Sequence, residues 1–224
     1  MEQTLLVLKP DATMRRGVGA AVFEQILTAL PDVKFKGFLE LAVARHLAEK
    51  HYAIHEGKFF YPWLLQFIQV GNVTATVLEG KDIVTRLREV LGATFVEKAS
   101  PESLRGRYGI VGGVNVAHAS DEPSNAKKEI ALWQNETELD LEQDGLELIH
   151  AYIARWQDTP ISATMPIRQA CEAYAQEYAN RDEYQQEITE FLMEECPDWS
   201  LSDLQNLSDA ILGNMDLDRD KPAE

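Results

Sequence analysis

Short apolar runs alternate with segments of helical periodicity along the first 135 residues of the chain. The first run, from Thr4 to Leu8, ends at Lys9-Pro10 and is typical of a buried strand. Further strand-like segments are residues 35–43, 73–78 and 107–111. Segments with apolar residues at helical spacing are 18–30, 46–52, 62–68, 81–91 and 126–133. The order β-α-β-α-β-α-β predicts an α+β fold with helices on one face of a mostly antiparallel sheet.

Beyond residue 135 the pattern is helical only. A first helix is expected from the apolar stripe that runs from Leu139 and Leu141 to Trp156. Pro160 and Pro166 interrupt it, and three more helices are expected at residues 167–178, 184–193 and 200–212. Ser200 and Asp203 resemble a capping box, and residues 216–224 are expected to be frayed.

The net charge of −16 is unevenly distributed. Residues 1–135 carry 16 basic and 15 acidic side chains, whereas residues 136–224 carry 5 and 22. We therefore predict two parts, a domain over residues 1–135 and an acidic helical extension over residues 136–224. The front part suits a small anionic substrate, and the acidity of the extension argues against nucleic acid or an anionic membrane as its partner.

Several classes of protein are disfavoured by the sequence. No apolar run reaches the roughly 20 residues that span a bilayer, and no signal peptide opens the chain. The two cysteines, Cys171 and Cys196, form neither a disulfide framework nor a metal site by their spacing. We expect a cytoplasmic protein.

The stretch from Asn115 to Asp121 carries the most distinctive candidate chemistry. It places His118 between two alanines, after a strand-like run and before a polar turn, so a firm base for a nucleophile is expected. A lone histidine is more often structural than catalytic. Its interpretation therefore depends on polar and aromatic residues elsewhere, which are Lys9-Pro10-Asp11, His51-Tyr52, Phe60, Arg88, Thr94, Arg105, Ser120, Glu129 and Trp133.

Together, in this order and spacing, these residues resemble the nucleoside diphosphate kinase family from Thr4 to about Trp133. The resemblance implies a ferredoxin-like antiparallel sheet covered by helices, to which the helical extension is added. It also implies a ping-pong reaction, in which His118 takes the γ-phosphoryl group of a nucleoside triphosphate and passes it to a nucleoside diphosphate. A neutral imidazole suits this nucleophilic role near pH 7.

The resemblance assigns a role to each candidate residue. Glu129 would orient His118 through its second ring nitrogen, and Tyr52 would bring a hydroxyl near the reacting ring. Lys9 would reach ribose hydroxyls and phosphate, and Asn115 would bond the sugar. The other expected substrate-binding residues are Arg88 and Arg105 as phosphate clamps, Thr94 as a hydroxyl donor, Phe60 as a stacking platform for any base, and Ser120. His51 and His55 are expected at the surface.

Mg²⁺ is the implied cofactor because bridging phosphates need neutralising. The sequence has no dedicated carboxylate cage, so we expect no metal site of the protein's own and a Mg²⁺ ion that arrives with the nucleotide. The implied partners are nucleoside tri- and diphosphates such as ATP and GTP, and further copies of the chain in a homo-oligomer.

Departures from the family pattern keep other interpretations open. Val114 stands where the family has Arg, so a structural charge pair is missing. Ala119 replaces a Gly that is common in the family. The loop at residues 95–104, which contributes to subunit contacts in the family, differs from the common family sequence. The alternatives are a catalytically silent nucleotide-binding or assembly module whose tail recruits a partner, and protein-histidine phosphotransfer. The extension would pack on its own domain or a neighbouring subunit, or its acidic side chains would cover the cationic site and modulate access.

Overall fold

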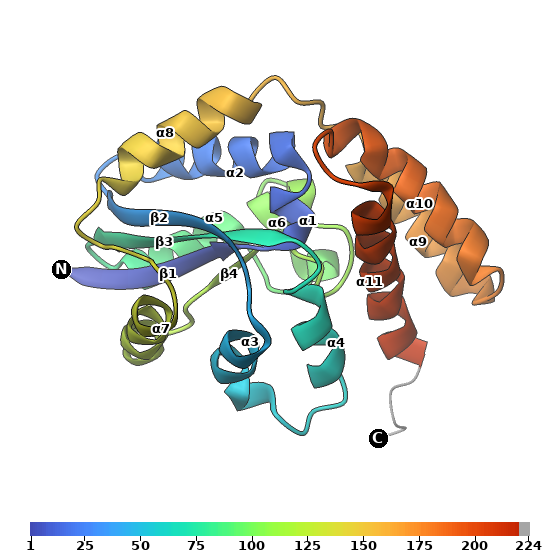
Figure 1. The fold of residues 1–224 in the computed structure, drawn as a ribbon, viewed down its shortest axis with the longest axis horizontal. Helices are drawn as coiled ribbons and strands as arrows, with labels where there is room; N and C mark the ends of the chain where they lie inside the picture. The colour runs from blue at the N-terminus through green and yellow to red at the C-terminus, as the bar shows by residue number, and fades with distance from the viewer. Residues whose placement is uncertain (220–224) are drawn as a thin grey trace.

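The computed structural model describes residues 1–219 and contains one antiparallel sheet (Figure 1). Its strands are β1 (Glu2–Leu8), β2 (Lys34–Ala42), β3 (Asn72–Gly80) and β4 (Ala117–Ala119), in the order β2-β3-β1-β4. The central strand β1 pairs with β3 through Leu5 and Val77 and with β4 through Val7 and His118. This order confirms the ferredoxin-like fold, and it places His118 in the edge strand β4, next to β1.

Helices cover both faces of this sheet, so the expectation of one covered face was wrong. Leu6 and Leu8 pack with α2 (Arg16–Ala29), α5 (Ile83–Leu91) and α8 (Gly145–Trp156). Leu5 and Val7 point the other way and pack with α3 (Arg45–His51), α4 (Tyr61–Phe67) and α7 (Pro123–Glu136). Because successive side chains of a strand face opposite sides, the continuous apolar run of β1 is what a sheet covered twice requires.

The strand predicted at residues 107–111 is the second error. Residues Leu104–Tyr108 form a short helix, α6, which Ser103 caps by accepting a hydrogen bond from the Gly106 N–H at 3.2 Å. The chain then turns at Gly112, whose φ of +51° suits glycine, and the last strand is β4. Aromatic and β-branched residues in this segment are therefore buried by tertiary packing and not by strand pairing.

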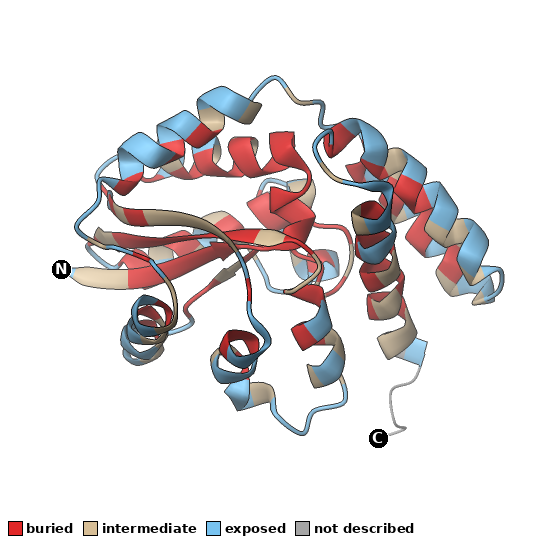
Figure 2. Ribbon diagram, in the orientation of Figure 1, coloured by how far each residue is buried: buried red, intermediate tan, exposed pale blue. Residues whose placement is uncertain are grey.

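The extension consists of α8, α9 (Thr164–Glu177), α10 (Arg181–Glu195) and α11 (Leu201–Arg219). Helix α8 lies on α2 and β2, whereas the inner faces of α9, α10 and α11 are buried against one another (Figure 2). Leu139 and Leu141 precede α8 and are outside it. The predicted division of the chain at residue 135 stays a prediction, since α7 runs through that point to Glu136.

The predicted start of α11 is confirmed, and its predicted end is partly wrong. Ser200 accepts a hydrogen bond from the Asp203 N–H at 3.2 Å, and the Asp203 carboxylate accepts one from the Ser200 N–H at 3.1 Å, which is a capping box. Residues 216–219, expected to be frayed, continue the helix. The rest of the expected frayed end, residues 220–224, lies outside the described residues.

A buried ion pair joins the bundle of the extension to the front part. Arg15 is fully buried and its Nε donates to Glu195 Oε2 at 2.5 Å, while the other carboxylate oxygen accepts the Ala163 N–H at 2.6 Å. Neighbouring Arg16 bonds Asp198 and lies between the rings of Trp156 and Trp199. The front part and the bundle are therefore joined by polar as well as apolar contacts.

We predict that Glu195→Ala lowers the free energy of unfolding by about 3–5 kcal/mol, because it leaves Arg15 buried without a counter-charge. Urea unfolding followed by circular dichroism measures the loss. Glu187→Ala, on the exposed side of the same helix, should leave the midpoint nearly unchanged. Equal midpoints for the two variants would contradict this account.

Candidate active site

The chain reaches His118 through a strained turn centred on Val116. Val116 has a φ of +78°, and the Ala117 N–H bonds the Asn115 carbonyl at 2.9 Å, which together make a classic γ-turn. Positive φ is rare for a β-branched residue, so the surroundings must hold this conformation. The buried Asp11 does so by accepting the Val116 N–H at 2.7 Å, and the Lys9 N–H donates to the Val116 carbonyl at 2.8 Å.

The His118 ring is oriented by the acid that the sequence suggested. Its Nε2 lies 3.0 Å from Glu129 Oε2, and the buried Ser120 hydroxyl donates to the same oxygen at 2.6 Å. Burial by itself raises the pKa of Glu129, but the hydrogen bonds and charge of His118, with the Ser120 bond, lower it overall. Glu129 is thus an ionised acceptor for an N–H at Nε2. Nδ1 forms no hydrogen bond with any part of residues 1–219.

His51 lies beside His118, so its placement at the surface was wrong. The two rings meet edge to face with centroids 4.4 Å apart, and His51 Nδ1 accepts the Trp133 indole N–H at 3.3 Å. Burial, followed by the proximity of His118, lowers the pKa of His51 to about 3 and keeps it neutral. Contact between α3 and α7 brings this histidine inward, which helical spacing alone did not indicate.

A row of rings leads from His118 to Phe60. Tyr52 lies 6.5 Å from His118 between centroids, His55 lies 6.4 Å from Tyr52, and Phe60 lies 5.4 Å from His55. The Tyr52 hydroxyl is buried and has no hydrogen-bond partner among residues 1–219. Burial raises its pKa, so it stays protonated and able to donate. Half-buried Phe60 precedes α4, and its ring carries the Lys58 ammonium above it at 5.7 Å. His55 is half-buried in this row, and its Nδ1 lies 3.0 Å from the exposed Lys58 ammonium.

Lys9 follows β1 and is 5% exposed. Its Nζ donates to Asn115 Oδ1 at 2.8 Å and to the Gly113 carbonyl at 3.1 Å. Burial lowers its pKa to about 8, with Asp11 opposing and Arg105 adding to the shift. Buried Asn115 donates in turn to the Thr94 carbonyl, while the Thr94 side chain is exposed.

The two predicted arginines differ in their surroundings. Arg105 is 4% exposed and donates to three carbonyls, those of Gly92 at 2.9 Å, Asn115 at 3.2 Å and Ala117 at 2.7 Å. Burial and the nearby Arg88 lower its pKa to about 10. Arg88 is half-buried and makes no hydrogen bond or ion pair within the described chain. Arg105 thus braces the backbone before His118, and Arg88 keeps its donors for a ligand.

The clustered donors distinguish between kinds of metal ion. His51, His118 and Glu129 offer two ring nitrogens and a carboxylate within 4.8 Å of one another. Mg²⁺ takes oxygen ligands in a demanding octahedron, so this set does not suit it. In the described part of the chain, these three donors around His118 therefore do not form a magnesium cage.

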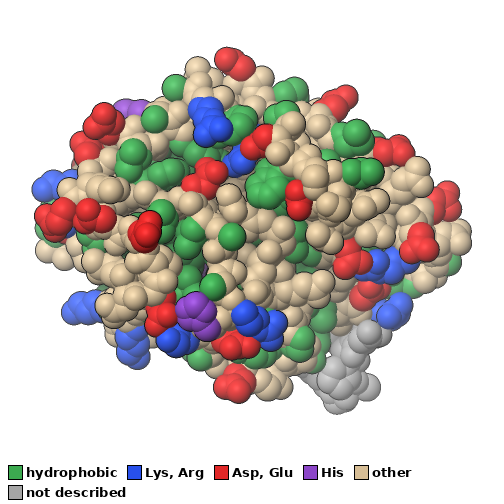
Figure 3. Space-filling view, in the orientation of Figure 1, with side chains coloured by type: hydrophobic (Ala, Val, Ile, Leu, Met, Phe, Trp, Pro, Cys, Tyr) green, Lys and Arg blue, Asp and Glu red, His purple; other side chains and the backbone are tan. Residues whose placement is uncertain are grey.

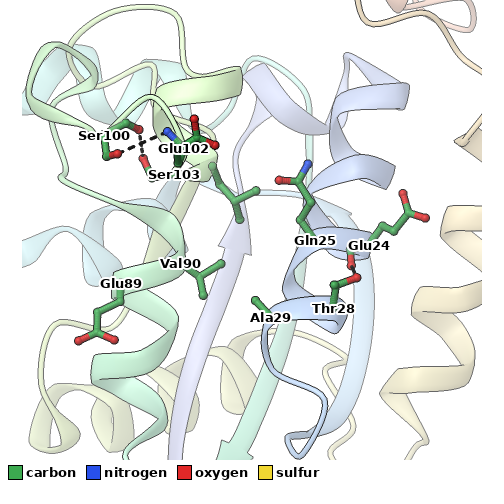
Figure 4. Close-up of a pocket in the computed structure, with 10 residues that line it drawn as sticks. Glu24, Gln25, Thr28, Ala29, Glu89, Val90, Ser100, Glu102 and Ser103 are labelled. Carbon is green, nitrogen blue, oxygen red and sulfur yellow. Dashed lines mark hydrogen bonds between the residues drawn. The ribbon is translucent and has the colours of Figure 1, made fainter.

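A groove of about 540 Å³ lies away from this site, between α2, α5 and the 100–104 segment (Figure 4). Three carboxylates, Glu24, Glu89 and Glu102, line it and would repel a polyphosphate. It contains none of the predicted site residues. The chemistry is better placed around His118, where Lys9, Arg88 and Arg105 concentrate positive charge.

The sequence did not single out Asp11, Val116 or His51 as parts of the site. Asp11 and His51 belong to the stretches that carry the family resemblance. Their neighbours Lys9 and Tyr52 were predicted site residues, so they could have indicated that Asp11 and His51 also lie at the site. Val116 gave no such signal, because a β-branched residue ordinarily predicts an extended backbone.

Residues 2–139 match the family model described as Nucleoside diphosphate kinase. A protein of that name from Carboxydothermus hydrogenoformans is 44% identical over 141 residues, which cover 62% of this chain and 91% of the relative. The solved nucleoside diphosphate kinase of Aquifex aeolicus is 33% identical with a TM-score of 0.53, covering 58% of this chain and 93% of that one. The Halobacterium salinarum enzyme, solved in complex with CDP, is 34% identical with a TM-score of 0.57, covering 66% and 97%.

We predict that Asp11→Ala destabilises the fold by about 1–3 kcal/mol, because it leaves the buried Val116 N–H without an acceptor. Asp11→Asn should cost less, since its side-chain oxygen can still accept that hydrogen bond. Chemical denaturation of both variants measures the difference. Equal losses would show that the carboxylate does not hold the turn through this bond.

Proposed function

The chain belongs to the nucleoside diphosphate kinase family, and we propose that it moves the γ-phosphoryl group of a nucleoside triphosphate to a nucleoside diphosphate through a phosphohistidine at His118. The observation that carries the proposal is the asymmetry of this ring. Nε2 is held by Glu129 at 3.0 Å, and Nδ1 has no partner in the described chain. A neutral ring held in one tautomer has its lone pair on the free nitrogen.

The proposed chemistry needs only the residues around this ring. The Nδ1 lone pair attacks the γ-phosphorus, the bond from phosphorus to the β,γ-bridging oxygen breaks, and the nucleoside diphosphate leaves with that electron pair. The Nε2 proton stays in place, where ionised Glu129 stabilises the positive ring. A second nucleoside diphosphate reverses the step, so one transfer becomes two in-line displacements.

Positive and polar groups would hold the phosphates and sugar. Arg88 has unpaired donors for a bidentate phosphate contact, and Arg105 has donors left beyond its three backbone bonds. Lys9 and Asn115, hydrogen-bonded to each other at 2.8 Å, would bind ribose hydroxyls and phosphate together. Tyr52 would donate its unpaired hydroxyl to the transferred group, and Thr94 would add an exposed one.

Phe60 would stack on the base at the far end of the ring row. Stacking accepts any base, contributes about 1–3 kcal/mol, and gives little discrimination among nucleotides. The CDP complex of the Halobacterium salinarum relative supports a nucleotide ligand for this part of the fold.

Mg²⁺ belongs to the proposal as a companion of the substrate. The donors at the site are mostly cations and amides, which suit phosphate oxygens and not the metal. The ion when bound would neutralise the bridging phosphates, and no residue described here is assigned to it.

Two expectations concern the setting of the protein. In residues 1–219 no helix combines the length and apolar character that crossing a membrane requires. A homo-oligomer and a cytoplasmic location stay predictions, because a single chain tests neither of them.

We predict that γ-labelled ATP leaves an acid-labile, base-stable label on the chain, and that His118→Ala abolishes it. His150→Ala removes an exposed histidine in the extension and should keep the label. Adding a nucleoside diphosphate should transfer the label to a nucleoside triphosphate. Transfer to proteins alone would favour protein-histidine phosphotransfer, and a wild-type chain without label would favour the silent module.

We also predict that kcat/KM falls above about pH 8, the pKa to which burial lowers Lys9 in the free enzyme. Lys9 is positive below that pH and neutral above it, so its grip on phosphate weakens as pH rises. Lys9→Arg keeps its charge throughout and should lack this decline. The test compares pH profiles normalised at pH 7, and a decline at the same pH in both proteins contradicts the assignment.

A further inference from the structure

Helix α11 of the extension lies against the two front-part segments that border the proposed nucleotide site. In Figure 1 it runs beside α4, which Phe60 precedes. Trp63 of α4 donates its indole N–H to the Ala210 carbonyl of α11 at 2.8 Å. Asn214, one turn further along α11, lies against the turn formed by Gly112 and Gly113.

The contact with this turn is close. Asn214 Oδ1 accepts the Gly113 N–H at 3.4 Å, and it fills the space that a Cβ on Gly112 would need. A Cβ on Gly113 would lie 3.0 Å from the Trp63 ring. Two adjacent glycines therefore allow α11 and α4 to approach the backbone here, and any larger residue would separate them.

Two short routes connect these contacts to Lys9. In the first, the Gly113 carbonyl accepts the Lys9 ammonium at 3.1 Å, so Asn214 and Lys9 hold the same residue from opposite sides. In the second, Trp63 stacks on Phe67 with centroids 5.1 Å apart, and the Lys9 ammonium lies 5.7 Å above the Phe67 ring.

Asn214 is exceptional among the polar residues of α11. Asn214 and Ser208 are the buried polar side chains of this helix in the described chain, and Ser208 pairs with Thr189 inside the bundle at 2.8 Å. Asn214, which is 8% exposed, faces the front part instead. Leu204, Leu207 and Ile211 already fix α11 by apolar packing, so the carboxamide is not needed to dock the helix.

We propose that Asn214 is a positioning residue for nucleotide binding, which holds the Gly112-Gly113 turn so that Lys9 and Asn115 meet the substrate. The proposal rests on the proposed function and adds a part of the extension to that site. The extension acts here by geometry and not by charge. Acidic side chains lie on the outer surface in the view of Figure 3. Those of residues 136–219 that form ion pairs with the front part are Glu136, Glu195 and Asp198. Their partners are Lys50 and His46, Arg15, and Arg16, which are not the predicted phosphate ligands.

The expected effect of losing Asn214 is on binding and not on chemistry. Lys9 and Asn115 would contact the nucleotide equally before and during transfer, so displacing them removes uniform binding and raises KM with kcat nearly unchanged. His118 lies in β4 and Glu129 in α7, whereas Asn214 contacts Gly112 and Gly113.

Steady-state kinetics of full-length Asn214→Ala test the proposal with GDP as the varied acceptor. We expect KM to rise on the order of 3- to 10-fold with kcat within about 2-fold. Asn206→Ala, on the exposed side of the same helix, should keep the wild-type KM. Asn214→Asp retains an acceptor for the Gly113 N–H and should recover most of the wild-type KM, which also keeps the test decisive if the alanine variant folds poorly.

An unchanged KM in Asn214→Ala, an equal rise in Asn206→Ala, or a fall in kcat alone would overturn the proposal. If the alanine variant folds poorly, the proposal is overturned by an Asn214→Asp variant that folds and yet has a raised KM. Labelling of His118 by γ-labelled ATP separates this failure from that of the proposed function. A wild-type chain that takes no label refutes the kinase, whereas a labelled chain with an insensitive KM refutes only the role of Asn214.

Discussion

The backbone between Gly113 and Ala117 is the constraint on which the rest of the site depends. The γ-turn at Val116 is unfavourable by itself, and four sets of contacts hold it. The Asp11 carboxylate accepts the Val116 N–H, and the Lys9 N–H donates to the Val116 carbonyl. Arg105 donates to the carbonyls of Asn115 and Ala117, and the residues after the turn pair with β1 as strand β4. Two of the residues that hold the turn, Lys9 and Arg105, also bring positive charge close to it. The formation of this turn and the placement of Lys9 and Arg105 therefore depend on the same contacts.

Val114 shows how the extension is built into this arrangement. The family resemblance leads one to expect an arginine there, but Val114 is fully buried in the apolar cluster formed with α9, α10 and α11. A charge at this position would be buried under the bundle without a partner. Apolar packing against the extension therefore stabilises the segment around Val114.

Much of the front part could be predicted from the sequence, because the local preferences of its residues agree with the elements that tertiary packing selects. The observed limits of β1, α2, β2 and α5 lie within two residues of the predicted ones at every end, since each combines clear periodicity with a proline, glycine or charged residue at its boundary. The segment at 107–111 failed because the Ser103 cap and the Gly112 turn outweigh the strand preference of Tyr108, Ile110 and Val111.

The sequence by itself determined the fold class and the family and predicted the pairing of His118 with Glu129, because these follow from periodicity and from residue types in a fixed order. Tertiary structure decided what those residues contact. His51 lies against His118, and Arg105 donates to backbone carbonyls. Asn214 contacts Gly113, about 100 residues earlier in the chain, whose carbonyl accepts the Lys9 ammonium. Such contacts join segments with no regular spacing between them. Only the packing of helices on both faces of the sheet brings them together.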